Sequence, residues 1–489
     1  MKKQKNLPNF PTTIFATAAR KAQAQIRTLK KELTRTTLTG YSSLFSEVLS
    51  PSFLDRIDQT TRQRHYGFIP VFWAWVGQII ECNSSCTRSV SLIQSWARTL
   101  NLPVPSKDSS AYCRARKRIS AATLQEANKQ VKNHLQKCIG DKDLWHGHQL
   151  LSIDGTSVRL MDTAKNQEAY PQPAGQKKDC GFPVMGVVAV ANHSHGGIVD
   201  SVTCGHQKHD AKMAPQLLHT IQQGDVMLAD RAFCSYEFTT RIIKERQGHF
   251  VMRLHQSRHR KLDWRKGKKL SSYERIVEWK RPTVQPPGSE LNKEEWKALP
   301  EKMLVRYIKM GYENRGGDKE MLVVVTDLLD PFAYPAEEVI DLYAERWRIE
   351  VKFRDIKTTM GMEHFAVKSP EMAHLTLQMM LITYNLIRCV MQTAAHEAGK
   401  SVHEMSFEGI RTVMTSSHES FRALSGKPLL MQKHFEAFIA NCAQHVLNIR
   451  PFRREPRALK LRPKNFQLLT SSRKTFQEIQ HRSKYRKSS

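Results

Sequence analysis

One short stretch of this chain combines residue types that could bind a metal ion and a phosphodiester together. Tyr343, Arg346, Glu350 and Lys357 follow one another at offsets of three, seven and fourteen residues. On a continuous helix these four side chains would fall within roughly 60° of one another. The carboxylate could bind a cation while the other three bind anionic oxygens. A solvated amphipathic face with i,i+4 pairing is the plainer interpretation of the same stretch.

Two aspartates each follow an apolar run that predicts a strand. HQLLSIDGT stops being apolar at Asp154, and GDVMLADRAF stops at Asp230. Ligands of α/β folds bind where strands end at the edge of a sheet, and two Asp with the helical Glu350 supply the oxygens that Mg²⁺ prefers. Taken singly, Asp154 could be an Asp-Gly turn, and Asp230 could cap a helix or pair with Arg231. Together the three carboxylates predict one catalytic metal site.

The order of elements between residues 149 and 255 indicates how the two aspartates could meet. A strand at 149–154 is followed by a predicted hairpin, a helix from about Asp210 to Gln222, the strand ending at Asp230, a second helix and a last strand. This is the ribonuclease-H-like order, in which the first and fourth strands are neighbours. His206, His209 and Asp210 could suggest a metal cluster, but a loop before a helix often collects such residues, with Asp210 as the cap.

The motifs together resemble those of bacterial insertion-sequence transposases of the DDE class with the YREK signature. This is the insertion-sequence-four family, which also contains the transposon-five transposase. The resemblance covers at least residues 149–365, and the segments at 109–120 and 453–466 also look like family features. The matching motifs are Ile153-Asp154-Gly155-Thr156, Ala229-Asp230-Arg231 and Tyr343-x2-Arg346-x3-Glu350-x6-Lys357, which includes the string RWRIE.

The resemblance implies cut-and-paste transposition of DNA. Two Mg²⁺ ions, with Mn²⁺ as a substitute, would be held by Asp154, Asp230 and Glu350. The partners would be double-stranded DNA, as terminal inverted repeats and as target, and a second copy of the chain in a synaptic homodimer. A hairpin intermediate at the element end is also implied. The expected phosphate contacts near the cleaved strand are Tyr343, Arg346 and Lys357.

The long separation of Asp230 from Glu350 predicts an inserted subdomain. Residues 256–281 contain ten Lys or Arg against three Asp or Glu, which favours a DNA-facing insertion, although a solvated loop is the alternative. The strand-like MLVVVTDL could also pair with the main sheet. Related enzymes stack an aromatic ring on an extruded base. The candidates are Trp264, Trp279 and Trp296, for which core packing is the alternative, and Trp347 within the signature.

Composition agrees with a nucleic-acid partner. The chain has 76 Lys plus Arg against 46 Asp plus Glu, a net charge of +30 that favours a polyanion. No apolar run reaches the length of about 18–20 residues that a membrane span needs, and the first residues lack an export signal. Nine scattered cysteines are expected to be reduced thiols. We expect a cytoplasmic, nucleoid-associated bacterial protein that does not bind membranes.

Hydrophobic patterning predicts an α/β protein: a ribonuclease-H-like mixed sheet core, interrupted by a β-rich insertion and flanked by helical regions. Residues 90–120 suit a helix-turn-helix whose basic helix would face DNA, with a solvated face as the alternative. The residues concerned are Arg114, Arg116, Lys117 and Arg118. The expected segments are a helical DNA-end-binding region at 1–145, the first part of the core at 146–255, the basic insertion at 256–330, the signature helix at 331–365, a helical C-terminal region at 366–448 and a basic tail at 449–489.

Two other functions share some of these features. A ribonuclease-H-like nuclease that cuts without joining would keep the three carboxylates. An inactive DNA-binding remnant would keep the charge and the helices but would not need the full signature. The presence of every expected catalytic position favours a transposase.

Overall fold

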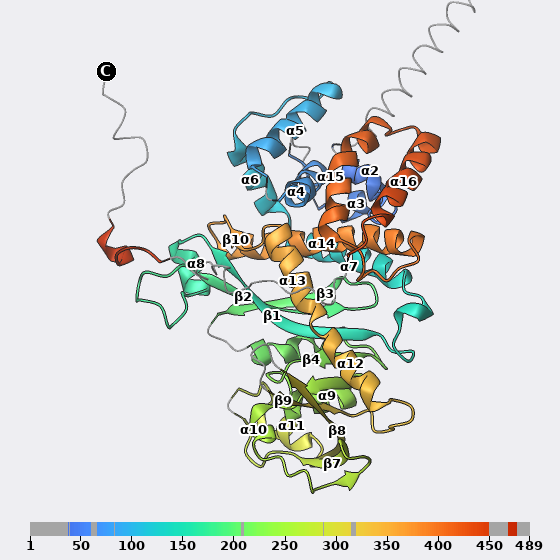
Figure 1. Cartoon of the computed structure of the whole chain (residues 1–489). Helices are drawn as coiled ribbons and strands as arrows, with labels where there is room; N and C mark the ends of the chain where they lie inside the picture. The colour runs from blue at the N-terminus through green and yellow to red at the C-terminus, as the bar shows by residue number, and fades with distance from the viewer. Residues whose placement is uncertain are drawn as a thin grey trace, which may run out of the picture. The chain divides into compact units, whose positions relative to one another are not determined.

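The computed structural model describes residues 38–448, apart from 39, 60–65, 83, 207–209, 287 and 314–318, together with residues 468–476. The family-like segment at 453–466 and His209 lie outside these described residues. The chain divides into two compact units, one with Met1–Ala127 and Gly409–Gln444, the other with Asn128–Glu408 and His445–Ser489. Each unit has its own helices, and the second also contains the large sheet (Figure 1).

The described part of the first unit is helical. Its centre is α4 (Phe68–Ile80), which is buried along most of its length. Arg411 donates a hydrogen bond of 2.7 Å to the carbonyl of Ile80, and the ring of Tyr41 stacks on His418. The other helices of this unit are α2 (Gly40–Leu44), α3 (Pro51–Ile57), α5 (Cys86–Thr99), α6 (Ser109–Arg118), the first part of α7 (Ala121–Lys137), nearly all of α15 (Phe407–Ala423) and α16 (Pro428–Ala443).

The second unit is built on one mixed sheet with the order β3-β2-β1-β4-β5-β9-β8-β7-β6, and β10 pairs with the end of β1. β4 lies parallel to β1 and to β5, and Ile153 pairs with Ala229. The predicted adjacency of the two strands that carry Asp154 and Asp230 is therefore confirmed. The strands are β1 (Leu150–Leu160), β2 (Val184–Asn192), β3 (Ile198–Gly205), β4 (Val226–Ala229), β5 (His249–Arg253), β6 (Lys268–Lys269), β7 (Glu274–Lys280), β8 (Lys302–Glu313), β9 (Lys319–Thr326) and β10 (His364–Phe365).

The prediction that the first strand ends at Asp154 is wrong. β1 continues to Leu160, because residues beyond Asp154 keep an antiparallel partner in β2, from Asp154 opposite Ala189 to Arg159 opposite Val184. A strand continues where its ladder continues, even after its apolar pattern stops. The short strand β4 ends at Ala229, beside Ile153, so β4 leaves one edge of β1 uncovered from Asp154 onward.

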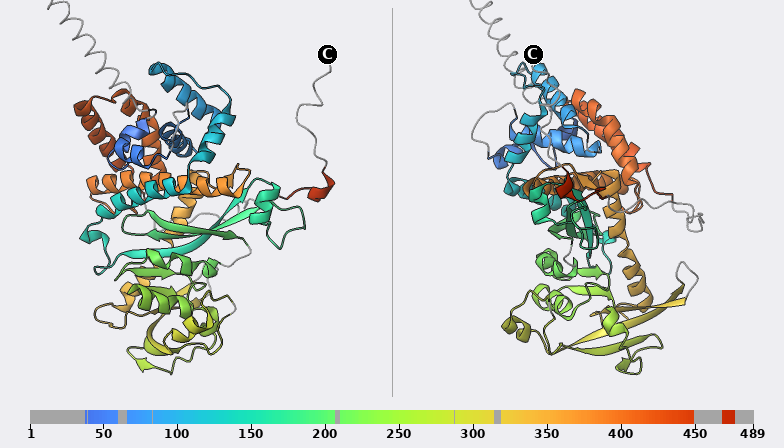
Figure 2. Two further views of the ribbon diagram at one scale, coloured as in Figure 1. Left: turned by 180° about the vertical axis from the view of Figure 1, so that it is seen from behind. Right: turned by 90° about the vertical axis from the view of Figure 1, so that its left-hand side faces the viewer.

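Helices cover the two faces of the sheet (Figure 2, right). Leu218 of η3 (Ala214–Thr220) and Ile242 of α9 (Tyr236–Arg246) pack on one face, and Leu342 of α12 (Ala336–Glu345) packs on the other. The helix predicted from Asp210 to Gln222 is instead two short 3₁₀ segments, η2 (Asp210–Lys212) and η3, with a proline near the start of η3. The remaining elements are η1 (Asp141–Asp143), α8 (Ala164–Ala169), α10 (Gln256–His259), α11 (Lys293–Ala298), α13 (Arg348–Arg354), η4 (Asp355–Thr359), α14 (Pro370–Glu397) and η6 (Arg473–Thr475).

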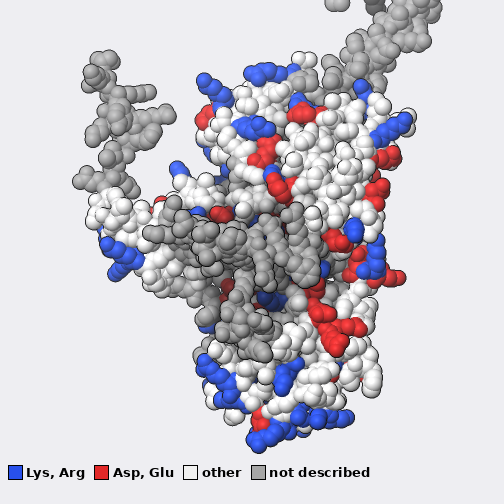
Figure 3. All heavy atoms as spheres, in the orientation of Figure 1, with Lys and Arg blue, Asp and Glu red and all other residues white. Residues whose placement is uncertain are grey.

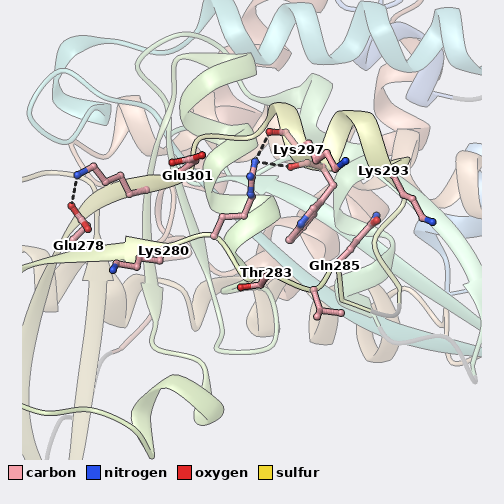
Figure 4. Close-up of a pocket in the computed structure, with 11 residues that line it drawn as sticks. Glu278, Lys280, Thr283, Gln285, Lys293, Lys297 and Glu301 are labelled. Carbon is pink, nitrogen blue, oxygen red and sulfur yellow. Dashed lines mark hydrogen bonds and ion pairs between the residues drawn. The ribbon is translucent and has the colours of Figure 1, made fainter.

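The strands of the expected insertion extend the main sheet. β9, which contains MLVVVT, pairs with β5, and β8, β7 and β6 follow in antiparallel order. Lys and Arg side chains gather over this end of the unit, at the bottom of the view in Figure 3. A groove of about 940 Å³ lies beside β7 and α11, with Lys280, Lys293 and Lys297 around it (Figure 4). No helix among the described residues is long and apolar enough to cross a membrane.

A buried ion pair joins these strands to the segment before α12. Arg306 of β8 is fully buried and donates a hydrogen bond of 2.8 Å from Nε to Glu274 of β7. Its Nη1 donates a bond of 2.6 Å to the carbonyl of Tyr334, which lies just before α12. The guanidinium of Arg306 thus connects the strands of the insertion to the segment that leads into α12.

Replacing Arg306 by Met should destabilise the protein by about 3–5 kcal/mol, because Glu274 is left as a buried charge without its partner. The measurement is the free energy of unfolding in urea. Lys302→Met is the matched control, since its ion pair with Glu278 spans the same two strands but is exposed. That control should cost less than about 1 kcal/mol. Equal losses in the two variants would contradict the prediction.

Candidate active site

Strand pairing brings Asp154 and Asp230 to the same place. Asp154 follows Ile153 in β1, Asp230 follows Ala229 in β4, and these two preceding residues pair in a parallel ladder. The backbone N–H of Gly155 donates a hydrogen bond of 2.8 Å to Oδ1 of Asp154. The uncovered edge of β1 therefore begins where the two aspartates emerge.

The guanidinium of Arg346 lies among the carboxylates. Its Nη1 is 3.7 Å from Oδ2 of Asp154, and its Nη2 donates a hydrogen bond of 3.1 Å to Oε1 of Glu350. Burial lowers the pKa of Arg346, but Tyr343, Asp230, Asp154 and Glu350 outweigh this effect and raise it. The structure thus brings the three predicted carboxylates together around one cation.

The signature does not lie on one regular helix, so that prediction is wrong. α12 ends at Glu345, and i→i+3 hydrogen bonds carry the chain through Arg346 and Trp347 into α13. Such bonds turn the chain by about 120° per residue instead of 100° and so redirect the side chains. A π-helical turn, η4, follows α13 and contains Lys357.

This change of helix type separates one signature residue from the others. Arg346 stays in electrostatic contact with both Tyr343 and Glu350. Burial lowers the pKa of Lys357, and the charges that act on it are those of Glu363 and Arg159. Arg159 lies five residues beyond Asp154 on β1, so Lys357 is placed further along that strand.

Burial dominates the electrostatics of Asp154. It raises the pKa of Asp154 to about 6, with smaller upward effects from Glu350 and Asp210 and downward effects from Gly155 and Arg346. Burial also raises the pKa of Tyr343 to about 12, and the nearby Asp230 adds to that rise. Tyr343 is therefore a neutral phenol that can donate a hydrogen bond at neutral pH.

Asp210 is the residue at this site that the sequence analysis did not assign to it. An ideal Cβ placed on Gly155 would lie 2.0 Å from Oδ2 of Asp210, so this carboxylate is in direct contact with the β1 backbone. The DG dipeptide was a usable signal, because a glycine within a strand often marks the close approach of another group. The sequence could not say which group approaches.

The donor set fits a divalent cation. It consists of carboxylate oxygens, as Mg²⁺ prefers, and its carboxylates outnumber the one guanidinium between them. Among the residues that the structure describes, no three His, Cys, Asp or Glu side chains are already gathered as metal ligands. A cation would therefore compete with Arg346 for the oxygens of Asp154 and Glu350.

The tryptophan candidates lie in different surroundings. Trp279 and Trp296 are buried, and Trp279 is part of the core cluster, as core packing requires. Trp264 donates a hydrogen bond to the carbonyl of Ser272 and has Lys309 over its ring. Trp347 is 53 % exposed, on the turn between α12 and α13, so it does not pack within the helix.

The basic helix α6 of the first unit presents part of its charge to solvent. Arg114, Lys117 and Arg118 are exposed. The guanidinium of Arg116 instead lies over the rings of Trp75, at 4.9 Å, and Tyr112, at 5.3 Å. Arg116 is therefore engaged in packing, whereas Arg114 and Lys117 are exposed and Arg118, also exposed, donates a hydrogen bond of 3.4 Å to the carbonyl of Tyr66.

In buffer with a metal chelator, the Asp154→Asn variant should have a free energy of unfolding about 2–3 kcal/mol higher than wild type at pH 8, but no such advantage at pH 4. The raised pKa favours the folded wild type below about pH 4, and this contribution is lost as the pH rises through 6. Thermal unfolding of both proteins from pH 4 to pH 8 measures the difference. Asp341→Asn, an exposed position on α12, should show no such trend. A difference that does not grow with pH would contradict the prediction.

Comparisons with known proteins agree with the geometry of the site. Residues 145–386 match the family model described as "Transposase DDE domain". The transposase InsG for insertion sequence element IS4 of Escherichia coli (strain K12) is 24 % identical over 428 residues, which cover 85 % of this chain and 90 % of that protein. The putative transposase InsZ of the same organism is 31 % identical over 127 residues, 26 % of this chain and 42 % of that protein.

Among solved structures, the chain is similar to a piggyBac transposase synaptic complex with hairpin DNA. The TM-score is 0.42 at 11 % identity, over 84 % of this chain and 85 % of that chain. The match to the family model includes β1, β4 and the whole signature segment. With the full-length similarity to the IS4 transposase, it identifies the protein as an enzyme that acts on DNA with a divalent metal. The chain is therefore a transposase with a DDE domain at residues 145–386, similar to the transposase of insertion sequence element IS4.

Proposed function

We propose that this transposase binds the terminal inverted repeats of its insertion sequence, cleaves the DNA there and joins the freed ends to a target by a cut-and-paste route. The observation that carries the proposal is the convergence of Asp154, Asp230 and Glu350 on Arg346. These carboxylates come from two strands and a helix that are far apart in the sequence. A protein that only bound DNA would not need them at one sheet edge.

In this proposal Asp154, Asp230 and Glu350 hold two Mg²⁺ ions, for which Mn²⁺ can substitute. Bound ions would supply activation of the attacking oxygen and neutralisation of charge on the leaving oxygen. The raised pKa of Asp154 supports the assignment, because it marks a buried carboxylate whose charge Arg346 only partly compensates. An added cation would favour the ionised form of that carboxylate.

The other signature residues would position the DNA backbone. With the carboxylates holding cations, the guanidinium of Arg346 would be free to bind two phosphate oxygens at once. Tyr343, held neutral by burial, would donate its hydroxyl proton in a hydrogen bond to a phosphate oxygen. Lys357 and Arg159 provide a second cationic position further along β1. The strand after the cleavage point could therefore follow the edge of β1.

The larger assembly in this proposal is a homodimer that holds two element ends, with a hairpin intermediate during excision. Exposed Arg114, Lys117 and Arg118 on α6 would contact the element end, and exposed Trp347 would contact DNA near the cleaved strand. The dimer and the hairpin are supported by the family resemblance. The α6 and Trp347 contacts are supported by the exposure of these side chains.

Glu350→Ala should abolish DNA cleavage while leaving binding to the element ends, because one metal ligand is lost and the first unit is unchanged. The test incubates each purified protein with DNA that spans the gene and its flanks, with Mg²⁺ and a supercoiled target, and sequences every new junction. Junctions that join element ends to the target, made only by wild type, would establish cut-and-paste transposition. Cuts without joining would favour the nuclease alternative. Undiminished cleavage by Glu350→Ala would overturn the catalytic assignment.

Charge removal on α6 should separate DNA contacts from packing. Lys117→Ala should weaken DNA binding with little loss of stability and should reduce the slope of log affinity against log salt by about 1. Arg116→Ala should mainly lower the thermal stability, because it removes the cation–π contacts with Trp75 and Tyr112. Binding isotherms at several salt concentrations and thermal unfolding measure the two effects. A reversed pattern would contradict the assignment of these two side chains.

A further inference from the structure

Asp210 is fixed beside the catalytic strand by the segment that follows it. Its carbonyl accepts a hydrogen bond of 2.9 Å from the N–H of Met213. Met213 and Ala214 are buried in the same core cluster as Ile153 of β1. This packing anchors the C-terminal side of η2 against the sheet, so Asp210 has a defined place near β1.

Gly155 provides the space that Asp210 occupies. Successive side chains of a strand point to opposite faces, so Gly155 shares a face with Ile153, on the side where η3 packs. A Cβ on Gly155 would lie 2.0 Å from Oδ2 and 2.8 Å from Oδ1 of Asp210. Real Cβ atoms are essentially never this close to other atoms, so any other residue at 155 would displace the carboxylate.

The two carboxylates approach one edge of β1 from opposite faces of the sheet. Asp154 points to the face opposite that of Gly155, toward Arg346. β4 ends at Ala229, so it does not separate the two faces at this position. Asp210 therefore lies beside the residue that directly follows Asp154 in β1.

We infer that Asp210 is a fourth oxygen ligand of the cation site, which it reaches around the edge of β1 beyond the end of β4, from the space beside Gly155. The inference rests on the proposed function, because it adds one residue to the metal site proposed there. A fourth carboxylate would give Mg²⁺ an oxygen donor from the face of the sheet opposite α12 and α13. It would also add negative charge to a site that must attract divalent cations within a strongly basic chain.

The test measures Mn²⁺ binding to the full-length protein by calorimetry, without DNA, so that it does not depend on catalysis. Asp210→Asn should weaken Mn²⁺ binding about 10-fold or more, as loss of a metal-site group does. Gly155→Ala keeps every carboxylate but displaces that of Asp210, and it should also weaken binding. The matched controls are Asp341→Asn, an exposed carboxylate, and Gly311→Ala, a strand glycine with open space around it; both should bind as wild type does.

The outcomes separate this inference from the proposed function. Asp210→Asn could bind Mn²⁺ as tightly as wild type while Asp154→Asn loses Mn²⁺ affinity. That result would overturn the role of Asp210 but would still agree with a site of three carboxylates. No saturable Mn²⁺ binding by wild type would also overturn the inference, while the sequencing of DNA junctions would still decide the proposed function. Thermal unfolding without metal shows whether each variant is folded. If Asp210→Asn does not fold, wild-type affinity in Gly155→Ala overturns the inference.

Discussion

The unequal lengths of β1 and β4 are the constraint on which the rest of the site depends. The two strands pair in parallel as far as Ile153 and Ala229, and then β4 stops while β1 continues on β2, with β10 joining its other edge only at Arg159 and Leu160. Asp154 and Asp230 emerge together at that step. The same step leaves an edge of β1 that β4 does not cover, along which a DNA strand could follow in the proposed function. If β4 were longer, it would cover that edge.

Charge compensation explains how a basic protein maintains an acidic site. Arg346 contacts Asp154 and Glu350 and interacts with Asp230, so one guanidinium limits the mutual repulsion of the carboxylates. It does not remove that repulsion, because burial and the neighbouring carboxylates still raise the pKa of Asp154. The folded chain therefore contains carboxylates whose charge a divalent cation would compensate further. Arg346 stabilises this arrangement without a cation and, in our proposal, turns to phosphate when cations bind.

The strands of the insertion belong to the same sheet as β1 and β4. The hydrogen-bonded ladder extends from β3 through β1 and β4 to β9, β8, β7 and β6. Arg306 adds a second connection, since it binds Glu274 and the carbonyl of Tyr334 before α12. The basic strands are therefore connected to the signature segment in two ways, through the sheet and through this ion pair. The groove in Figure 4 lies at this end of the sheet, where Lys280, Lys293 and Lys297 are found.

The sequence by itself determined the kind of chemistry, because DG, ADR and the YREK spacing are local patterns of residue type. It also predicted that the strands of Asp154 and Asp230 pair, since the order of elements restricts the topology. Only the tertiary structure decided where β1 ends, because β2 maintains its ladder after the apolar pattern stops. Likewise, side-chain spacing does not report the π-helical turn that contains Lys357 and interrupts the regular helix after Glu350. The place of Asp210 depends on a long-range contact with Gly155, so no local pattern could determine it.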